Sequence, residues 1–389
     1  MSRRGTAVAA VVVTLLLAWL GLFPILVVRA GGAHGPPGGG FLARRGEWAA
    51  LWASIWISLA SVVLAAGIGI PLAFLFEWFD FPGRKTLGAI IALPVVLPPL
   101  VGVIAFLFLY GESGFVARTI QALFGLEQAP WRLQGPLAIL LVHAYSMYVY
   151  FYLFTRAGLA RLDVSMLEAA EALGADRRRT LWRVVLPLLR PSLVGAAMLT
   201  FMTSLGSFSA PYIFGGGFRV MTTQIVATKL NGDLPLAMVE TLMLALVAVV
   251  ALVILRRTEG DDILVALGKG IAPRPRPIRS VGIRRLTTVA GWGLAVLLLL
   301  PHLTLGLVSL VPYGAWTTEI LPPIINLDNY RRLFSEPERL RPLLNSLWMA
   351  AASTAAAVVL ALVAGWLVVR RRVVLRRVIE GLLVLPWAL

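Results

Sequence analysis

The sequence predicts an all-α integral membrane protein built as a polytopic bundle of helices. Of its 389 residues 59% are hydrophobic and only 14% are charged, and the mean hydropathy is +0.85. A soluble protein could not bury that much apolar surface. Apolar runs of about 20 residues, the length of helix that crosses ~30 Å of hydrocarbon, recur along the chain. The lack of cysteine excludes disulfides, thiol catalysis and cysteine-bound metals.

The runs place about six spans in a first module and about three in a second. We expect them near 6–28, 51–76, 86–110, 135–154, 191–208, 234–255, 286–311, 346–369 and from 378 onward. The first run is long for a signal-peptide core, so we expect it to stay in place as a span. With the N-terminus in the cytoplasm, most of the 35 Lys and Arg residues fall in cytoplasmic segments. Topology therefore explains the formal charge of +16 and no nucleic acid is implied, although a polybasic face touching anionic lipid is a secondary alternative.

Prolines interrupt the third predicted span at Pro94, Pro98 and Pro99. A proline inside a helix removes a backbone hydrogen bond and bends the axis. Pro94 and Pro98 are therefore candidate hinges or gates of a pathway. The alternative is that they only shape the bundle.

The loop between the fourth and fifth spans is charged and helix-forming, whereas loops in that position are usually short. Ser165 and Glu168 have the spacing of a capping box, and Gly174 is placed to end a first short helix. Asp176 can cap a second helix that runs to Pro187. The alternative interpretation is an amphipathic loop that touches only lipid head groups.

The same loop carries a motif, E-A-A, three residues, G, nine residues, an aliphatic residue, any residue and L-P. Its members here are Glu168, Ala169, Ala170, Gly174, Val184, Leu186 and Pro187. The motif resembles the cytoplasmic coupling loop of permeases in binding-protein-dependent ABC importers. The resemblance implies that the loop, taken as residues 157–190, docks on a dimer of separate ATPase subunits. It further implies a multi-pass protein of the bacterial cytoplasmic (inner) membrane, supplied by an external solute-binding protein, either periplasmic or lipid-anchored.

Polar stripes on two predicted spans are candidates for the wall of a solute pathway. The residues are His143, Ser146 and Tyr150 in the fourth span, and Thr200, Thr203, Ser204 and Ser207 in the fifth. Their spacing places each set on one helix face. Hydroxyl groups also serve ordinary helix packing, and a lone buried histidine is often bonded to a neighbouring helix. Both explanations remain open.

The segment GSFSAPYIFGGGF, residues 206–218, breaks the fifth span at its predicted external end. Gly215, Gly216 and Gly217 suit a re-entrant or gating loop, since glycine adopts conformations closed to other residues. An ordinary tight connection is the alternative.

An internal repeat indicates two fused modules. At one constant offset Trp56 aligns with Trp348, and Arg84 with Arg376. Leu93 and Pro94 align with Leu385 and Pro386 in the same register. We therefore expect a first module at 1–256, a cytoplasmic Pro- and Arg-rich linker at 257–285, and the start of a second module at 286–389. A second coupling loop would lie beyond Leu389, so we expect the chain to be a fragment.

The sequence predicts a transport subunit and not an enzyme. It has no phosphate-binding loop, so ATP is expected on the partner ATPase, with no cofactor or metal bound by this chain. The three histidines have no metal-ligand spacing. The fused layout and residues 206–218 look most like ferric iron permeases, and permeases for thiamine, polyamine or phosphonate are alternatives. An ion-coupled secondary transporter is a further alternative, although acidic residues deep in the spans are scarce.

Overall fold

The computed structural model describes residues 10–19, 44–257 and 275–370, apart from 313, 317–319 and 321, and also residue 379. Within these residues seven helices are long and apolar enough to cross a membrane. They are Arg45–Trp78, Pro99–Phe124, Gly135–Leu159, Arg177–Leu205, Leu234–Leu255, Val281–Ser309 and Pro337–Leu367. A shorter apolar helix, Ala10–Trp19, covers part of the first predicted span. The predicted all-α, multi-spanning fold is confirmed.

Some predictions concern parts of the chain that are not described. Apart from Ile379, the ninth predicted span lies outside the described residues, as do positions 258–274 of the predicted linker. Arg376 and Pro386 of the internal repeat also lie outside them.

The chain divides into two compact units. The larger unit contains Arg45–Gln224 and Val250–Gly306, and the smaller unit contains Met1–Arg44, Ile225–Val249 and Leu307–Leu389. Each of these units combines residues from both predicted modules. The division into two fused modules therefore stays a prediction. Every candidate site residue lies in the larger unit.

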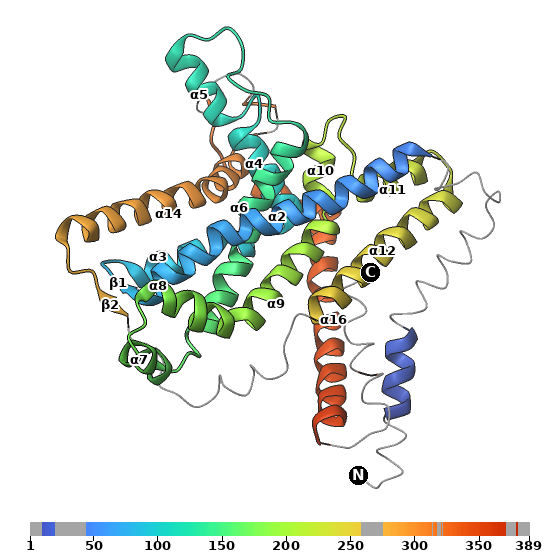
Figure 1. Ribbon diagram of the computed structural model, residues 1–389. Helices are drawn as coiled ribbons and strands as arrows, with labels where there is room; N and C mark the ends of the chain where they lie inside the picture. Colours follow the sequence, from blue (N-terminus) through green and yellow to red (C-terminus); the bar gives the residue numbers. More distant parts are fainter. Residues whose placement is uncertain are drawn as a thin grey trace. The chain divides into compact units, whose positions relative to one another are not determined.

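Three helices form the centre of the larger unit, namely α2 (Arg45–Trp78), α6 (Gly135–Leu159) and α9 (Leu186–Leu205), as Figure 1 shows. Of the apolar window of α6, 56% of the residues are buried, against 28% for α2. Helix α6 is therefore the central helix of this unit, which explains why it carries polar residues that lipid would not tolerate.

Glycines allow these helices to approach closely. A Cβ atom at Gly69 of α2 would lie 2.7 Å from Phe151 Cβ and 2.9 Å from the backbone nitrogen of Tyr152. One at Gly158 of α6 would lie 2.7 Å from Ser192 Oγ of α9. Association of membrane helices depends on such contact between small residues, because lipid supplies no hydrophobic drive.

The third predicted span is broken completely, which is sharper than the predicted bend. It consists of α3 (Arg84–Ile91), the 3₁₀ turn η2 (Leu93–Val96) and α4 (Pro99–Tyr110). Pro98 has extended backbone and stands directly before α4. The carbonyls released at the end of α3 are satisfied by α6, since the Tyr148 hydroxyl donates to Ile91 O (2.6 Å) and the Tyr152 hydroxyl to Gly88 O (3.1 Å). Buried backbone groups inside a membrane need such partners.

A two-residue parallel strand pair, which the sequence did not predict, anchors the end of the linker. Strand β1 (Phe79–Asp80) follows α2 and pairs with β2 (Arg276–Pro277). Ile278, directly after β2, packs against the core of the larger unit. The linker therefore ends beside the start of α3.

Helix α14 (Val281–Ser309) begins inside the predicted linker and packs on the helices of the first module. Ala295 and Leu298 join one buried core with residues of α2, α3 and α6. The Tyr145 hydroxyl of α6 donates to Leu298 O at 3.0 Å. A span expected to open the second module thus belongs to the larger unit.

The smaller unit contains most of α12 (Leu234–Arg257) and the last long helix. Here Thr228 Oγ1 donates to Glu240 Oε1 at 2.8 Å. Asn329 Nδ2 donates to Ser309 O, at the end of α14, and to Val311 O, two residues beyond that end. Further helices among the described residues are α5 (Phe115–Phe124), α10 (Ser209–Phe214), α11 (Met221–Leu230), α15 (Asp328–Ser335) and α16 (Pro337–Arg370).

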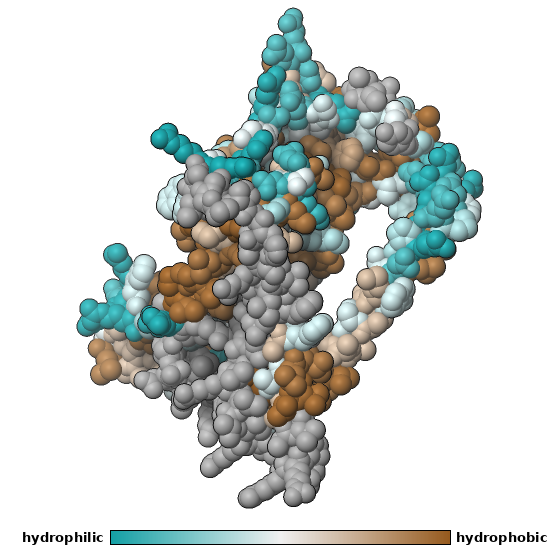
Figure 2. All heavy atoms as spheres, turned by 90° about the vertical axis from the view of Figure 1, so that its right-hand side faces the viewer, coloured by the Kyte–Doolittle hydropathy of each residue, from teal (hydrophilic) through white to brown (hydrophobic). Residues whose placement is uncertain are grey.

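Large apolar side chains are exposed along the spanning helices, as the brown areas of Figure 2 illustrate for one face. Leu59 and Val63 of α2 are examples, and Val63 is 69% exposed. In a soluble protein such a surface would drive aggregation. Here it suits contact with lipid.

Candidate functional site

The loop between α6 and α9 folds as two short helices, α7 (Val164–Ala172) and α8 (Arg177–Thr180). The prediction that Ser165 is the N-cap of the first loop helix is wrong. Asp163 caps α7 instead, and its Oδ1 accepts from the Ser165 backbone N–H at 3.0 Å. The backbone is extended at Asp163 and helical from Val164 onward, so the N-cap lies two residues before the predicted one.

Gly174 ends α7 as predicted, with φ +79°. Its N–H donates to Glu171 O, and the N–H of Ala175 donates to Ala170 O, both at 3.0 Å. This pair of bonds is the Schellman arrangement, which requires a left-handed residue and therefore favours glycine. Asp176 caps α8 as predicted, because its Oδ1 accepts from the Arg179 N–H at 2.7 Å.

The second helix does not stop at Pro187. It passes through a π-helical turn, η3 (Leu181–Val185), directly into α9, so that Arg177–Leu205 is one candidate span. Pro187 fits at the start of α9, where a missing N–H costs little. Motion of the loop would therefore act on α9 without an intervening hinge loop.

The loop combines a buried base with an exposed tip, whose Glu171 pairs with Arg276 at 3.8 Å. Leu159, Leu162, Val185 and Leu189 form a buried cluster at the base. In contrast, α7 has no buried residue, and Leu173 at its end is 87% exposed. Of the motif residues Glu168, Ala169, Gly174 and Pro187 are exposed, and Ala170 and Leu186 are half-buried. Exposed alanines and an exposed leucine form a low-relief surface suited to a protein partner.

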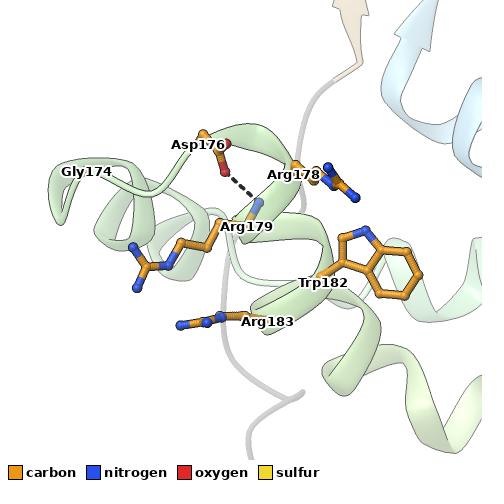
Figure 3. A pocket seen from close by; sticks show the side chains of 6 residues that line it. All are labelled: Gly174, Asp176, Arg178, Arg179, Trp182 and Arg183. Atoms are coloured by element: carbon orange, nitrogen blue, oxygen red, sulfur yellow. Dashed lines mark hydrogen bonds between the residues drawn. The ribbon is translucent and has the colours of Figure 1, made fainter.

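Beside Gly174 the loop has an open depression lined by cationic and aromatic side chains (Figure 3). Its volume is about 630 Å³. The lining residues are Gly174, Asp176, Arg178, Arg179, Trp182 and Arg183.

A second polar group lies deep among α2, α6 and α9, centred on His143. The side chain of His143 is 1% exposed. Its Nδ1 lies 2.9 Å from Ser61 Oγ and 3.1 Å from Ser204 Oγ, and its Nε2 lies 3.0 Å from Ser207 Oγ. Ser204 Oγ also donates to Ser61 Oγ at 3.2 Å. We call these four residues the His143 cluster. It joins three helices by hydrogen bonds.

Sequence reasoning did not select Ser61 as a site residue, although it belongs to the cluster. The available signal was the stripe of Ser54, Ser58 and Ser61, which share one face of α2 and are all buried. Thr200 and Thr203 of the predicted stripe do not join the cluster, because their hydroxyls donate to Ala196 O and Leu199 O of their own helix.

Next to the cluster lies a cavity of about 480 Å³, formed by η2, α4, α6, α9 and the start of α10. It brings together most of the predicted pathway residues, namely His143, Ser146, Tyr150, Thr203 and Ser207, together with the predicted hinge Pro94. Thr200, Ser204 and Pro98 are not among its lining residues. Tyr145 and Ser209 line it and were not predicted.

Residues 206–218 form a packed turn around α10. Phe214 is buried and its ring lies 6.2 Å from that of Phe106. Gly216 has φ +58°, and a Cβ at Gly215 would lie 2.7 Å from Phe218 O, so both positions require glycine. The three glycines 215–217 do not line the cavity. A gating role for them stays a prediction.

Comparison with known proteins identifies the family. Residues 35–257 match the family model described as "Binding-protein-dependent transport system inner membrane component". The chain is 30% identical over 341 residues to the probable ABC transporter permease protein y4fN of Sinorhizobium fredii, covering 87% of this chain and 60% of that protein. It is 33% identical over 169 residues to the molybdenum transport system permease protein ModB of Escherichia coli, covering 43% of this chain and 72% of ModB.

A ferric transport system permease protein, FbpB of Actinobacillus pleuropneumoniae, is 31% identical over 39% of this chain and 22% of its own length. Among solved structures, a bacterial alginate ABC transporter in complex with a pentasaccharide-bound periplasmic protein has a chain that matches with a TM-score of 0.54. That match covers 68% of this chain and 97% of the other at 18% identity, and it supports the fold alone. The chain thus spans 60% of the length of y4fN and 22% of the length of FbpB. The described fold and the matched residues establish that this chain belongs to the family of inner membrane permease components of binding-protein-dependent ABC importers.

Proposed function

We propose that this chain forms the translocation pathway of an ATP-driven importer that receives its cargo from an external binding protein. A dimer of separate ATPase subunits would dock on α7 from the cytoplasm, with the N-terminus of the chain on the same side of the inner membrane. ATP would be bound by that dimer and by no site of this chain. Membership of the family and the exposed loop at the end of two spans support this proposal.

The observation that carries the proposal is the connection between loop and cavity. Helix α6 leads into the loop at Leu159 and also supplies His143 to the cavity wall. Helix α9 leaves the loop and supplies Thr203 to the same cavity wall. Closure of the ATPase dimer on ATP would displace α7, and both helices would carry this displacement to the cavity.

The coupling step can be tested with two matched glycine variants of the complete transporter. Gly174 and Gly125 both follow a helix with positive φ (+79° and +61°), and a Cβ at either position meets nothing within 4 Å. Gly174→Ala and Gly125→Ala therefore impose similar backbone strain, roughly 1–2 kcal/mol, without a clash. We expect Gly174→Ala, like Glu168→Ala, to lower cargo uptake per ATP hydrolysed in proteoliposomes, and Gly125→Ala to leave it unchanged. Equal ratios for the two glycine variants would contradict the coupling role of this loop.

Ferric iron, the cargo expected from the sequence, is one candidate, and a relative named for ferric transport supports it. An oxyanion such as molybdate is the second, supported by the greater coverage of ModB and by the cavity. Most of the residues that line the cavity are apolar; its polar side chains are hydroxyls and one imidazole, and none of its side chains is charged. Within the described part of the chain no group of three or more His, Asp or Glu is placed to hold a metal ion. Hydroxyl and imidazole N–H groups can donate to oxyanions, whereas bare metal cations prefer clustered carboxylates, imidazoles or thiolates.

Titration calorimetry of the cognate binding protein distinguishes these cargoes. It would be measured against ferric iron, molybdate, thiamine, a polyamine and a phosphonate, followed by uptake of the bound compound. We expect molybdate or a similar oxyanion to bind. Binding of ferric iron alone would overturn the oxyanion proposal, and uptake driven by an ion gradient without the ATPase would overturn the importer itself.

A further inference from the structure

The depression beside Gly174 points to a ligand that the transport cycle does not require. We propose that Arg178, Arg179, Trp182 and Arg183 form a binding site for the phosphate-bearing head group of an anionic membrane lipid. The proposal uses only the membrane fold and the loop geometry, so it does not depend on the cargo or on the ATPase.

The four side chains arise from one continuous helix. Arg178 and Trp182 are four residues apart, as are Arg179 and Arg183, so each pair shares one side of the helix. Figure 3 shows Arg179 and Arg183 extending together on one side, with Arg178 and Trp182 on the other. All four side chains are exposed, and the indole of Trp182 is 63% exposed.

The positive charge of the three arginines exceeds the single negative charge in the lining of this site. Arg178, Arg179 and Arg183 form no ion pair with any described residue. The nearest acid in the lining, Asp176, is already used as the N-cap of α8. Arginine presents a planar fork of donors that matches the oxygens of phosphate, so the neighbouring Arg179 and Arg183 favour a phosphate group, and Arg178 adds positive charge to the same lining.

The position of the site favours lipid over an acidic protein surface. The helix Arg177–Leu205 is a candidate membrane span, and the site occupies its first two turns. Side chains there lie at the boundary between hydrocarbon and water, where tryptophan and arginine are both favourable. The exposed indole of Trp182, on the side of Arg178, can contact acyl chains and glycerol while the guanidinium groups bind the head group. The docking surface proposed for the ATPase is the preceding helix, α7.

The test measures lipid retained by the purified chain. The wild type, the triple variant Arg178→Gln/Arg179→Gln/Arg183→Gln and the control Arg132→Gln/Arg219→Gln would be compared in mixed micelles of phosphatidylglycerol and phosphatidylcholine by native mass spectrometry. The control arginines lie on segments predicted to face the opposite side of the membrane. Each juxtamembrane arginine contributes about five-fold to binding of anionic lipid, so we expect the triple variant to bind phosphatidylglycerol roughly 100-fold more weakly. Retention of phosphatidylcholine should not change.

Several results would overturn the proposal. Equal retention of phosphatidylglycerol by the wild type and the triple variant is one, and an equal loss in the control is another. Displacement of the lipid by millimolar inorganic phosphate would identify free phosphate as the ligand. A triple variant that keeps its lipid and loses only ATPase binding would identify an acidic protein surface. If the triple variant does not fold, Arg179→Gln and Arg183→Gln would be measured singly, each with an expected loss of about five-fold.

Discussion

Replacement of Ser61 by alanine tests whether the His143 cluster holds three helices together. Ser58 provides a control one turn away on the same face of α2. Both serines are fully buried, and each donates to the carbonyl four residues earlier at 2.7 Å. Only Ser61 has partners on other helices, with His143 Nδ1 at 2.9 Å and Ser204 Oγ at 3.2 Å. The difference between Ser61→Ala and Ser58→Ala therefore isolates the contacts between helices.

The expected difference is about 1 kcal/mol. Hydrogen bonds between membrane helices are worth about 0.6 kcal/mol on average and at most ~1.7 kcal/mol, and Ser61 makes two. The intrahelical bond and the lost hydroxyl volume are common to both variants and cancel. The free energy of unfolding would be measured by titration with a denaturing detergent, with helical circular dichroism as the signal. Equal destabilisation by both variants would refute a stabilising role for the cluster.

Three further variants test two contacts between helices and one helix cap. Gly69→Ala should destabilise the protein by about 1–3 kcal/mol, because its Cβ would overlap α6. Gly67→Ala, whose Cβ would meet nothing within 4 Å, should be neutral or slightly stabilising. Thermal unfolding of the two variants measures the difference, and similar midpoints would contradict the close packing at Gly69. Tyr148→Phe leaves Ile91 O without its 2.6 Å donor, so a loss of about 1–3 kcal/mol is expected, and an unchanged midpoint would mean that the break before α4 needs no such partner. Asp163→Ala removes the N-cap of α7 and should destabilise that helix by about 1 kcal/mol. We expect faster amide hydrogen exchange in α7 and an unchanged midpoint of global thermal unfolding. Unchanged exchange in α7 would argue against this cap.

Local features of the chain could be predicted from the sequence because their causes are local. The spans follow from apolar length, and the ends of the loop helices follow from Gly174 and Asp176, whose conformations are determined within a few residues. The wrong N-cap, Ser165, also has a local cause. Asp163 and Ser165 can both accept a hydrogen bond at the start of the helix, and the sequence spacing does not reveal that the backbone is extended at Asp163.

The sequence could not predict which helices pack together, because an apolar face that contacts another helix has the same hydropathy as one that contacts lipid. Nothing in α14 indicates that Ala295 and Leu298 would pack with α2 and α6. Ser61 alone is an unremarkable hydroxyl, and it becomes part of a site only when α6 brings His143 to within 2.9 Å. The break in the third predicted span could be predicted only in part. Pro98 predicts an interruption of the helix, but a full break also needs Tyr148 and Tyr152 of α6 to bind the released carbonyls.

The length of the helices explains how a displacement at the loop would reach the cavity. His143 precedes the end of α6 at Leu159 by 16 positions, which at 1.5 Å per residue places it about 24 Å along the helix. Tilting α6 by roughly 10° about its loop end would then move His143 by about 4 Å, which is more than any hydrogen bond tolerates. If α6 tilted alone, its bonds to Ser61 and Ser204 would break. The cluster therefore favours joint movement of α2, α6 and α9 as one body, and the cavity would open by displacement of that body from η2 and α4, which line the cavity but contribute nothing to the cluster.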